Sequence, residues 1–157
     1  MVLDPGGPEC SCGNHGCLEA FASDGTVISR CESAMRMGEA PILRQICGGE
    51  SPTIPQIVRA QELGETGIEH IVDTAINSLG VVIANIENFA RPHMMLIEAG
   101  LFALEANRKK LLDVVHKNLY TAMPLDTSFE FIMPDPFSGA LGGAAIAIRG
   151  DLETYIE

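Results

Sequence analysis

The sequence predicts an α/β fold in which at least part of the sheet is parallel. Two short apolar runs, residues 93–97 and 129–133, have the length and composition of strands. Helical periodicity separates them at about residues 103–120, and a longer helical segment precedes the first run. Because strands and helices alternate along the chain, neighbouring strands are expected to run parallel. The run at 93–97 is continuously apolar, so it is expected to be covered on both faces.

The longest helix is expected over about residues 65–89, where apolar residues recur at helical spacing. Gly80 lies inside it and costs about 1 kcal/mol relative to alanine, so its missing side chain is expected to allow a neighbour to approach closely. The helix should end before Pro92. Further helices are expected at about residues 17–37, with a break near Asp24 and Gly25, at 55–63 after a Thr53 cap, and at 138–156, where an Ala- and Gly-rich composition suits tight packing.

Length, composition and charge narrow the class of protein. A chain of 157 residues with 46% apolar and 20% charged residues is expected to form a single domain over 1–157. Its formal net charge of −11 disfavours direct contact with nucleic-acid phosphates. No apolar run approaches the roughly 18 residues that cross a bilayer, and no signal peptide is recognisable, so a cytoplasmic location without membrane contact is expected.

Three cysteines crowd into a short loop near the start of the chain, with the sequence CSCGNHGCLE. Cys10, Cys12 and Cys17 follow the spacing C-x-C-G-x-x-G-C, in which the glycines allow the sharp turns needed to aim three sulfurs at one point. Zinc in a structural site takes four ligands, often thiolates. The spacing therefore indicates a metal site, and three metal-free cysteines are the alternative. His15 is a local candidate for the fourth ligand, although a residue between two ligands in so tight a turn often points outward.

The segment CSCGNHGCLEAFAS, preceded by VLDPGGPE, resembles the zinc loop of the ROK family of repressors, open reading frames and kinases. The likeness extends to the closing SGALGGAAIAI. The resemblance implies the C-terminal half of an actin-like, ribonuclease H-like sugar-kinase fold with a zinc-binding loop at residues 10–19. It also implies a structural zinc held by Cys10, Cys12 and Cys17. In the family, the fourth ligand is a histidine ten residues before the first cysteine, a position that falls just before Met1.

Glu19 follows the last cysteine by two positions and is expected to open a helix. An acidic residue in the first turn of a helix stabilises the helix by about 0.3–1 kcal/mol, and this effect alone can explain why a glutamate occurs at position 19. The resemblance implies a second role, because the family's glutamate at this position accepts hydrogen bonds from sugar hydroxyls. An ionised carboxylate is an acceptor-only group suited to that contact.

The ROK family contains sugar kinases and sugar-responsive regulators. The kinases carry a Gly-Gly pair after a strand at their second nucleotide-binding segment, and the matching place here reads Glu98, Ala99 and Gly100. A carboxylate facing a polyphosphate is repelled by roughly 1–4 kcal/mol at 4 Å. This degenerate segment argues against ATP binding, unless the alignment is shifted by one or two residues. The kinases' phosphate loop and catalytic aspartate are not recognisable, so the chain alone is not expected to phosphorylate a sugar.

The favoured hypothesis is therefore the sugar-sensing and dimerising part of a ROK transcriptional regulator. Its expected partners are a sugar effector, a second copy of the chain, and DNA through a separate upstream domain. The alternatives are the C-terminal half of an ATP-dependent ROK hexose kinase and a ligand-free structural domain. In the last case, exposed apolar surface is expected to cause self-association.

Several other polar or reactive residues are not expected to form a site. Cys31 lies on an apolar helix face and is expected in the core, and Cys47 adjoins a Gly-Gly loop that could expose it. The basic residues at 108–110 are expected to form a solvated helix surface. Three histidines have no partners at a recognisable spacing and are assigned to core or surface positions: His70, His93 and His116.

Overall fold

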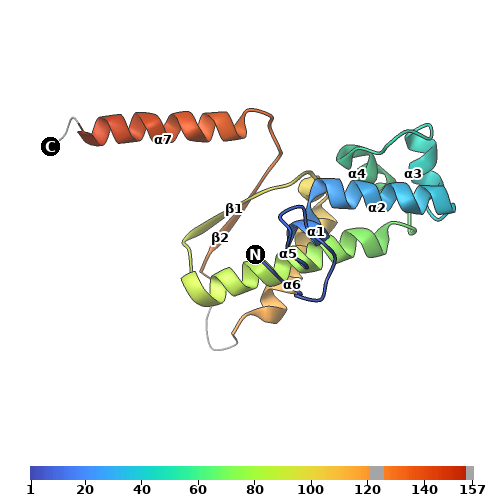
Figure 1. Cartoon of the computed structure of the whole chain (residues 1–157), viewed down its shortest axis with the longest axis horizontal. Helices are drawn as coiled ribbons and strands as arrows, with labels where there is room; N and C mark the ends of the chain where they lie inside the picture. Colours follow the sequence, from blue (N-terminus) through green and yellow to red (C-terminus); the bar gives the residue numbers. More distant parts are fainter. Residues whose placement is uncertain (121–125, 155–157) are drawn as a thin grey trace.

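A computed structural model describes residues 1–120 and 126–154, and the side chains of 150–154 are not part of that description. Figure 1 shows a helical body around one long helix, with a small sheet on one side and the last helix standing apart. The elements in order are α1 Glu19–Ala22, α2 Asp24–Met37, α3 Pro41–Ile46, α4 Ile54–Glu62, α5 Glu69–Ala90, β1 Met94–Glu98, a 3₁₀ helix η1 Gly100–Ala103, α6 Glu105–Asn118, β2 Ser128–Ile132 and α7 Ser138–Thr154.

The sheet consists of β1 and β2, which run parallel in a register that pairs Met94 with Ser128. Helix α6 lies between the two strands in the sequence, so the unit is β-α-β, as predicted. The expectation that the first strand is covered on both faces is wrong. Ile97 is buried, but Met94 is 52% and Leu96 58% exposed, because the described elements cover one face of the sheet.

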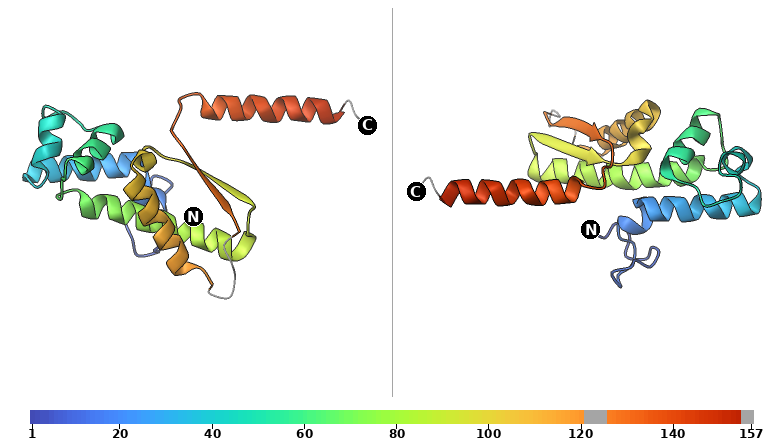
Figure 2. Two further views of the ribbon diagram at one scale, coloured as in Figure 1. Left: turned by 180° about the vertical axis from the view of Figure 1, so that it is seen from behind. Right: turned by 90° about the horizontal axis from the view of Figure 1, so that it is seen from above.

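Helix α5 is the centre of the body and packs against α6, α1 and α2. Figure 2 shows α5 between the sheet on one side and α2 with the N-terminal loop on the other. The close approach predicted at Gly80 is confirmed, since an ideal Cβ there would lie 2.6 Å from Val114 Cγ1 of α6. The close crossing of α5 and α6 therefore requires a residue without a Cβ atom at position 80.

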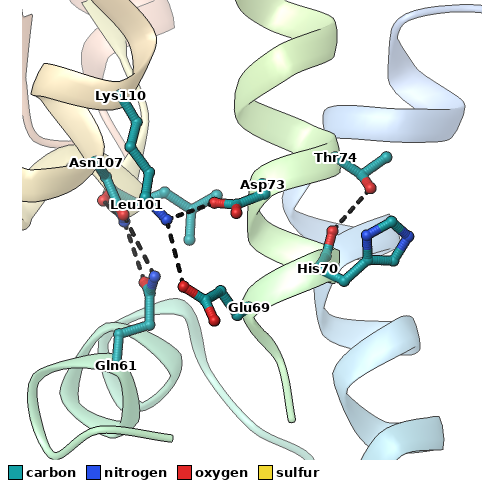
Figure 3. A network of polar contacts seen from close by, with 8 residues as sticks. All are labelled: Gln61, Glu69, His70, Asp73, Thr74, Leu101, Asn107 and Lys110. Carbon is teal, nitrogen blue, oxygen red and sulfur yellow. Dashed lines mark hydrogen bonds and ion pairs between the residues drawn. The ribbon is translucent and has the colours of Figure 1, made fainter. Parts of the chain in front are cut away.

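A polar network joins α5 to α6 (Figure 3). The Lys110 ammonium of α6 lies 2.7 Å from Asp73 Oδ1 and 3.8 Å from Glu69 Oε1, both on α5. Lys109 is exposed and the Lys110 side chain is 42% exposed, so the expectation of a solvated basic surface at 108–110 holds for these two residues. It is wrong for Arg108, whose guanidinium stacks 5.4 Å from the Phe131 ring centre and donates to the Phe102 carbonyl.

A pair of amide side chains, Gln61 of α4 and the buried Asn107 of α6, links these two helices beside that network (Figure 3). Asn107 is 1% exposed, and its amide nitrogen donates to the Leu101 carbonyl at 2.8 Å and to Gln61 Oε1 at 3.1 Å. Gln61 in turn donates to Asn107 Oδ1 at 3.3 Å. Because every polar atom of the Asn107 amide has a partner, its burial fixes the relative placement of the two helices without an unsatisfied group.

Helix α3 was not predicted, because much of what stabilises it is distant in sequence. The buried carboxylate of Glu65 accepts from the backbone N–H of Ile42 at 2.8 Å and of Leu43 at 3.3 Å, which caps the start of α3. The loop after α3 also differs from expectation, since Cys47 is 7% exposed and belongs to the core together with the fully buried Cys31. The predicted Thr53 cap of α4 is confirmed by a capping box with Gln56.

Helix α7 extends away from the body in Figures 1 and 2. The expectation that it packs tightly is wrong for its described side chains, since Leu141, Ile146 and Ile148 are 62–75% exposed. The final part of the predicted helix, beyond residue 154, lies outside the described residues. Within the described chain no helix combines the length and apolar composition needed to cross a membrane.

Candidate functional site

The loop before α1 folds back on the chain's first residues. Gly13 and Gly16 adopt positive φ angles of 86° and 63°, a conformation that costs other residues about 1–2 kcal/mol. The Gly16 carbonyl accepts from the N–H of Leu3 at 2.7 Å and of Asp4 at 3.2 Å. An ideal Cβ on Gly16 would lie 1.5 Å from the Asp4 carbonyl oxygen, so a glycine is required there on steric grounds as well.

These turns bring the three cysteines of the loop together. The Sγ atoms of Cys10, Cys12 and Cys17 all lie within 4.8 Å of one another, and those of Cys12 and Cys17 are 3.6 Å apart. Ligands held at about 2.3 Å on the corners of a tetrahedron are separated by about 3.8 Å. The sulfur spacing therefore suits one tetrahedral metal ion, and among the described residues this is the one converging group of three or more His, Cys, Asp or Glu side chains.

The thiols of the loop are electrostatically distinct. A hydrogen bond from the backbone of Asn14, supported by the Cys10 and Cys17 thiols, lowers the pKa of Cys12. The hydrogen bond with Cys12, reinforced by desolvation, raises the pKa of Cys17 to about 11. Of these two causes, the hydrogen bond with Cys12 has the larger effect on the Cys17 pKa. Cys12 ionises before Cys17, and a bound cation would favour the thiolate of both.

His15 does not join the cluster. It is exposed, and its backbone forms an antiparallel bridge with Glu9. Its ring nitrogens are not part of the group of ligand atoms that converge within 4.8 Å. The chain's own loop therefore offers three sulfur ligands and leaves one corner of a tetrahedron open.

Glu19 is the first residue of α1 and lies directly beside the cysteine loop. Ser11 lies between Cys10 and Cys12 in the sequence. Its hydroxyl donates a hydrogen bond to Glu19 Oε1 at 3.2 Å. The Glu19 carbonyl accepts from Thr26 Oγ1 at 3.0 Å, which ties the short α1 to α2. The Glu19 side chain is exposed, so its carboxylate has free acceptor positions.

The predicted nucleotide segment lies at the carboxyl end of β1, where ligands bind in many parallel sheets. The exposed Glu98 carboxylate accepts from the Asp135 backbone N–H at 3.3 Å. Ala99 precedes the 3₁₀ helix η1, and Gly100 opens it. An ideal Cβ on Gly100 would lie 2.7 Å from Ile54 Cγ2, so this glycine has a packing role that does not require a nucleotide.

A hollow that the sequence did not indicate lies between α6 and β2. It has a volume of about 710 Å³ and is lined by both basic and acidic side chains. Arg108, stacked on Phe131, forms part of its wall. The cation–π contact joins residues far apart in sequence, and no local spacing signals it. None of the predicted site residues lines this hollow.

The ROK family model matches residues 1–149 of this chain, and the chain therefore belongs to the ROK family. It is 26% identical over 141 residues to the xylose repressor of Caldicellulosiruptor bescii, covering 88% of this chain and 35% of the repressor. It is 24% identical over 155 residues to the glucokinase of Thermotoga maritima, covering 93% of this chain and 47% of the kinase. The resemblance inferred from the cysteine loop is thus confirmed.

The fold is shared with solved ROK structures. A ROK family transcriptional regulator, a homologue of the Escherichia coli Mlc protein, superposes with a TM-score of 0.72 at 23% identity, covering 83% of this chain and 33% of the regulator. Repressors and kinases both occur among the relatives. The chain spans about a third to a half of the length of the proteins compared.

Proposed function

We propose that this chain is the sugar-sensing and dimerising C-terminal part of a ROK transcriptional regulator. In this proposal residues 1–157 form one subdomain, and Cys10, Cys12 and Cys17 hold a structural zinc. Glu19 contacts a sugar effector, and DNA is bound by a separate upstream domain. The observation that supports the proposal is that the loop which brings three thiols together also holds the Glu19 carboxylate, through the hydroxyl of Ser11.

The role of the metal is to fix the position of Glu19. Cys17 lies two residues before Glu19, and a metal ion bound to three points of the loop would restrict the start of α1. When bound, zinc would supply rigidity here, provided that a fourth ligand from outside this loop closes the tetrahedron, because a closed structural site has no position open to substrate. The Ser11 hydroxyl holds one carboxylate oxygen and leaves the second free to accept from a sugar hydroxyl.

The nucleotide segment favours the regulator over the kinase. Glu98 places a negative charge at the carboxyl end of β1, where a kinase of this family brings backbone close to a polyphosphate. The identity to a xylose repressor supports the same choice. The second candidate, a sugar kinase, is supported by the identity to a glucokinase over 93% of this chain.

Calorimetry on the full-length protein tests the sugar contact. We expect D-xylose or D-glucose to bind the wild type, and Glu19→Ala to weaken binding at least 100-fold without loss of folding. Glu50→Ala removes an exposed carboxylate from a loop and serves as the matched control with unchanged affinity. An unchanged affinity in Glu19→Ala contradicts the assigned role, and no binding of either sugar by the wild type favours the ligand-free domain.

Titration with ATP in the presence of sugar separates the regulator from the kinase. The proposal predicts no binding at millimolar ATP and no phosphorylated sugar. Sugar-dependent ATP turnover by the full-length protein would establish the kinase instead.

Self-association is the expected consequence of the apolar surface that this chain exposes. Apolar side chains of β1, of the end of β2, of the segment between β2 and α7, and of α7 itself are open to solvent. Light scattering on the full-length protein is expected to show dimers. A monomer at all concentrations contradicts the dimerising role. The residues concerned are Met94, Leu96, Ile132, Met133, Phe137, Leu141, Ile146 and Ile148.

A further inference from the structure

The three cysteines of the loop differ in how far solvent reaches them. Cys12 is exposed, whereas Cys10 is 6% and Cys17 7% exposed. A small oxidant in solution therefore meets the Cys12 sulfur first. An accessible cysteine with a second thiol beside it is a typical site of reversible oxidation, because the neighbour can close a disulfide. The chain's two other cysteines, Cys31 and Cys47, are buried in the core.

The Cys17 sulfur lies where it can react with an oxidised Cys12. Their Sγ atoms are 3.6 Å apart, in contact and not bonded. A disulfide bond is about 2.05 Å long, so the two sulfurs must approach by about 1.6 Å to form one. Among the described residues, nothing lies within 4 Å of an ideal Cβ on Gly13, which follows Cys12. The exposed side of the loop therefore has room for this small movement.

We propose that the cysteine loop is a peroxide-responsive switch in which Cys12 and Cys17 form a reversible disulfide. The Cys12 thiolate attacks one oxygen of hydrogen peroxide, the O–O bond breaks, and hydroxide leaves and takes up a proton to become water. The Cys17 thiolate then attacks the Cys12 sulfur, the S–S bond forms, and the sulfenic oxygen leaves as a second water. Two thiols lose two electrons while one peroxide is reduced to two waters. Dithiothreitol reverses the change and is itself oxidised to a disulfide.

The effect of the switch on the molecule rests on the proposed function, because the same thiolates would hold the zinc. A thiolate serves either as a metal ligand or as the nucleophile that meets an oxidant, so the two states exclude each other. The disulfide leaves Cys10 as the one free thiol of the loop. Ser11, which precedes Cys12, donates to Glu19 and so connects the oxidised pair to the sugar contact. Oxidation is therefore expected to release the metal and to remove a restraint on the start of α1.

Treatment of the full-length protein with hydrogen peroxide, in a zinc-loaded and a chelator-treated sample, tests the switch. Differential alkylation and fragmentation mass spectrometry identify the cysteines that lose their free thiols, and a chromogenic chelator measures released zinc. We expect a disulfide that joins Cys12 to Cys17 in both samples and release of one zinc per chain from the loaded sample. Dithiothreitol is expected to restore both thiols. The buried Cys31 and Cys47 are expected to stay reduced and serve as internal controls.

Two variants complete the test in the chelator-treated state. Cys12→Ser is expected to slow the loss of loop thiols at least 10-fold, whereas Cys47→Ala, the control, is expected to react as the wild type does. The proposal is overturned if peroxide leaves Cys12 and Cys17 reduced, joins either of them to another cysteine, or oxidises Cys12 beyond recovery by dithiothreitol. These wild-type outcomes decide the question even if Cys12→Ser fails to fold. An untreated protein that takes up no zinc refutes the proposed zinc site alone, because the disulfide is also scored without metal.

Discussion

Replacing Gly16 by alanine is expected to destabilise the cysteine loop far more than the same change at Gly13. Both glycines have positive φ angles, so each alanine costs about 1–2 kcal/mol for the left-handed backbone. At Gly13 nothing lies within 4 Å of an ideal Cβ, so alanine there has only this backbone cost and no steric clash. At Gly16 the Cβ would lie 1.5 Å from the Asp4 carbonyl oxygen, so the first residues of the chain must move away.

That movement breaks the hydrogen bonds from Leu3 and Asp4 to the Gly16 carbonyl. At about 0.5–1.5 kcal/mol each, their loss adds about 1–3 kcal/mol. We therefore expect Gly16→Ala to cost about 2–5 kcal/mol and Gly13→Ala about 1–2 kcal/mol in the free energy of unfolding. Urea denaturation with a fixed metal content measures both.

Comparing the two variants tests whether the first residues of the chain pack on the loop. If Gly16→Ala is no more destabilising than Gly13→Ala, the first residues do not pack on the loop as described. The cysteines would then be held by local turns alone.

Three further predictions concern the body of the protein. Gly80→Ala is expected to lower the free energy of unfolding by about 1–2 kcal/mol, because the clash with Val114 outweighs the roughly 1 kcal/mol gain in helix propensity; a stabilised variant in urea denaturation contradicts this packing. Glu65→Gln is expected to cost about 1.5–3 kcal/mol, because the charged cap of α3 is lost, and a calorimetric Tm equal to that of the wild type refutes the capping role. Burial raises the pKa of Cys31 to about 12, so the unfolded chain loses this proton first and stability should fall as pH rises from about 9 to 12; Cys31→Ala should flatten that slope, and an unchanged slope contradicts it.

The elements with strong local signals were predictable from the sequence. The periodicity of α5, the capping box of α4 and the β-α-β unit all depend on residues close together in the chain. A packing role for Gly80 was predictable because glycine inside a helix lowers helix stability, so its presence there suggests that a side chain would not fit.

Features that depend on distant partners were not predictable. Helix α3 is capped by Glu65, more than twenty residues further along the chain, and Lys110 pairs with two carboxylates of α5. The exposure of β1 and α7 was missed for a related reason, because an apolar run shows that a surface tends to be covered and not what covers it.

The candidate site was predictable in part. The spacing of Cys10, Cys12 and Cys17 indicated convergence, and their sulfurs do converge. Glu19 was placed beside them by its position in the sequence, but the hydrogen bond from Ser11 had no sequence signal. The hollow between α6 and β2 was missed entirely, because the cation–π contact in its wall joins Arg108 and Phe131, which are far apart in sequence.

The central claim is that three sulfurs of one loop hold a single zinc ion and so fix Glu19. X-ray absorption at the zinc edge, with elemental analysis of the same full-length protein, tests it most directly. The account predicts one zinc per chain with three sulfur neighbours at about 2.3 Å, and loss of that shell in Cys12→Ser. A folded protein that takes up no zinc when it is supplied, or a zinc ion surrounded by nitrogen and oxygen alone, would contradict the claim.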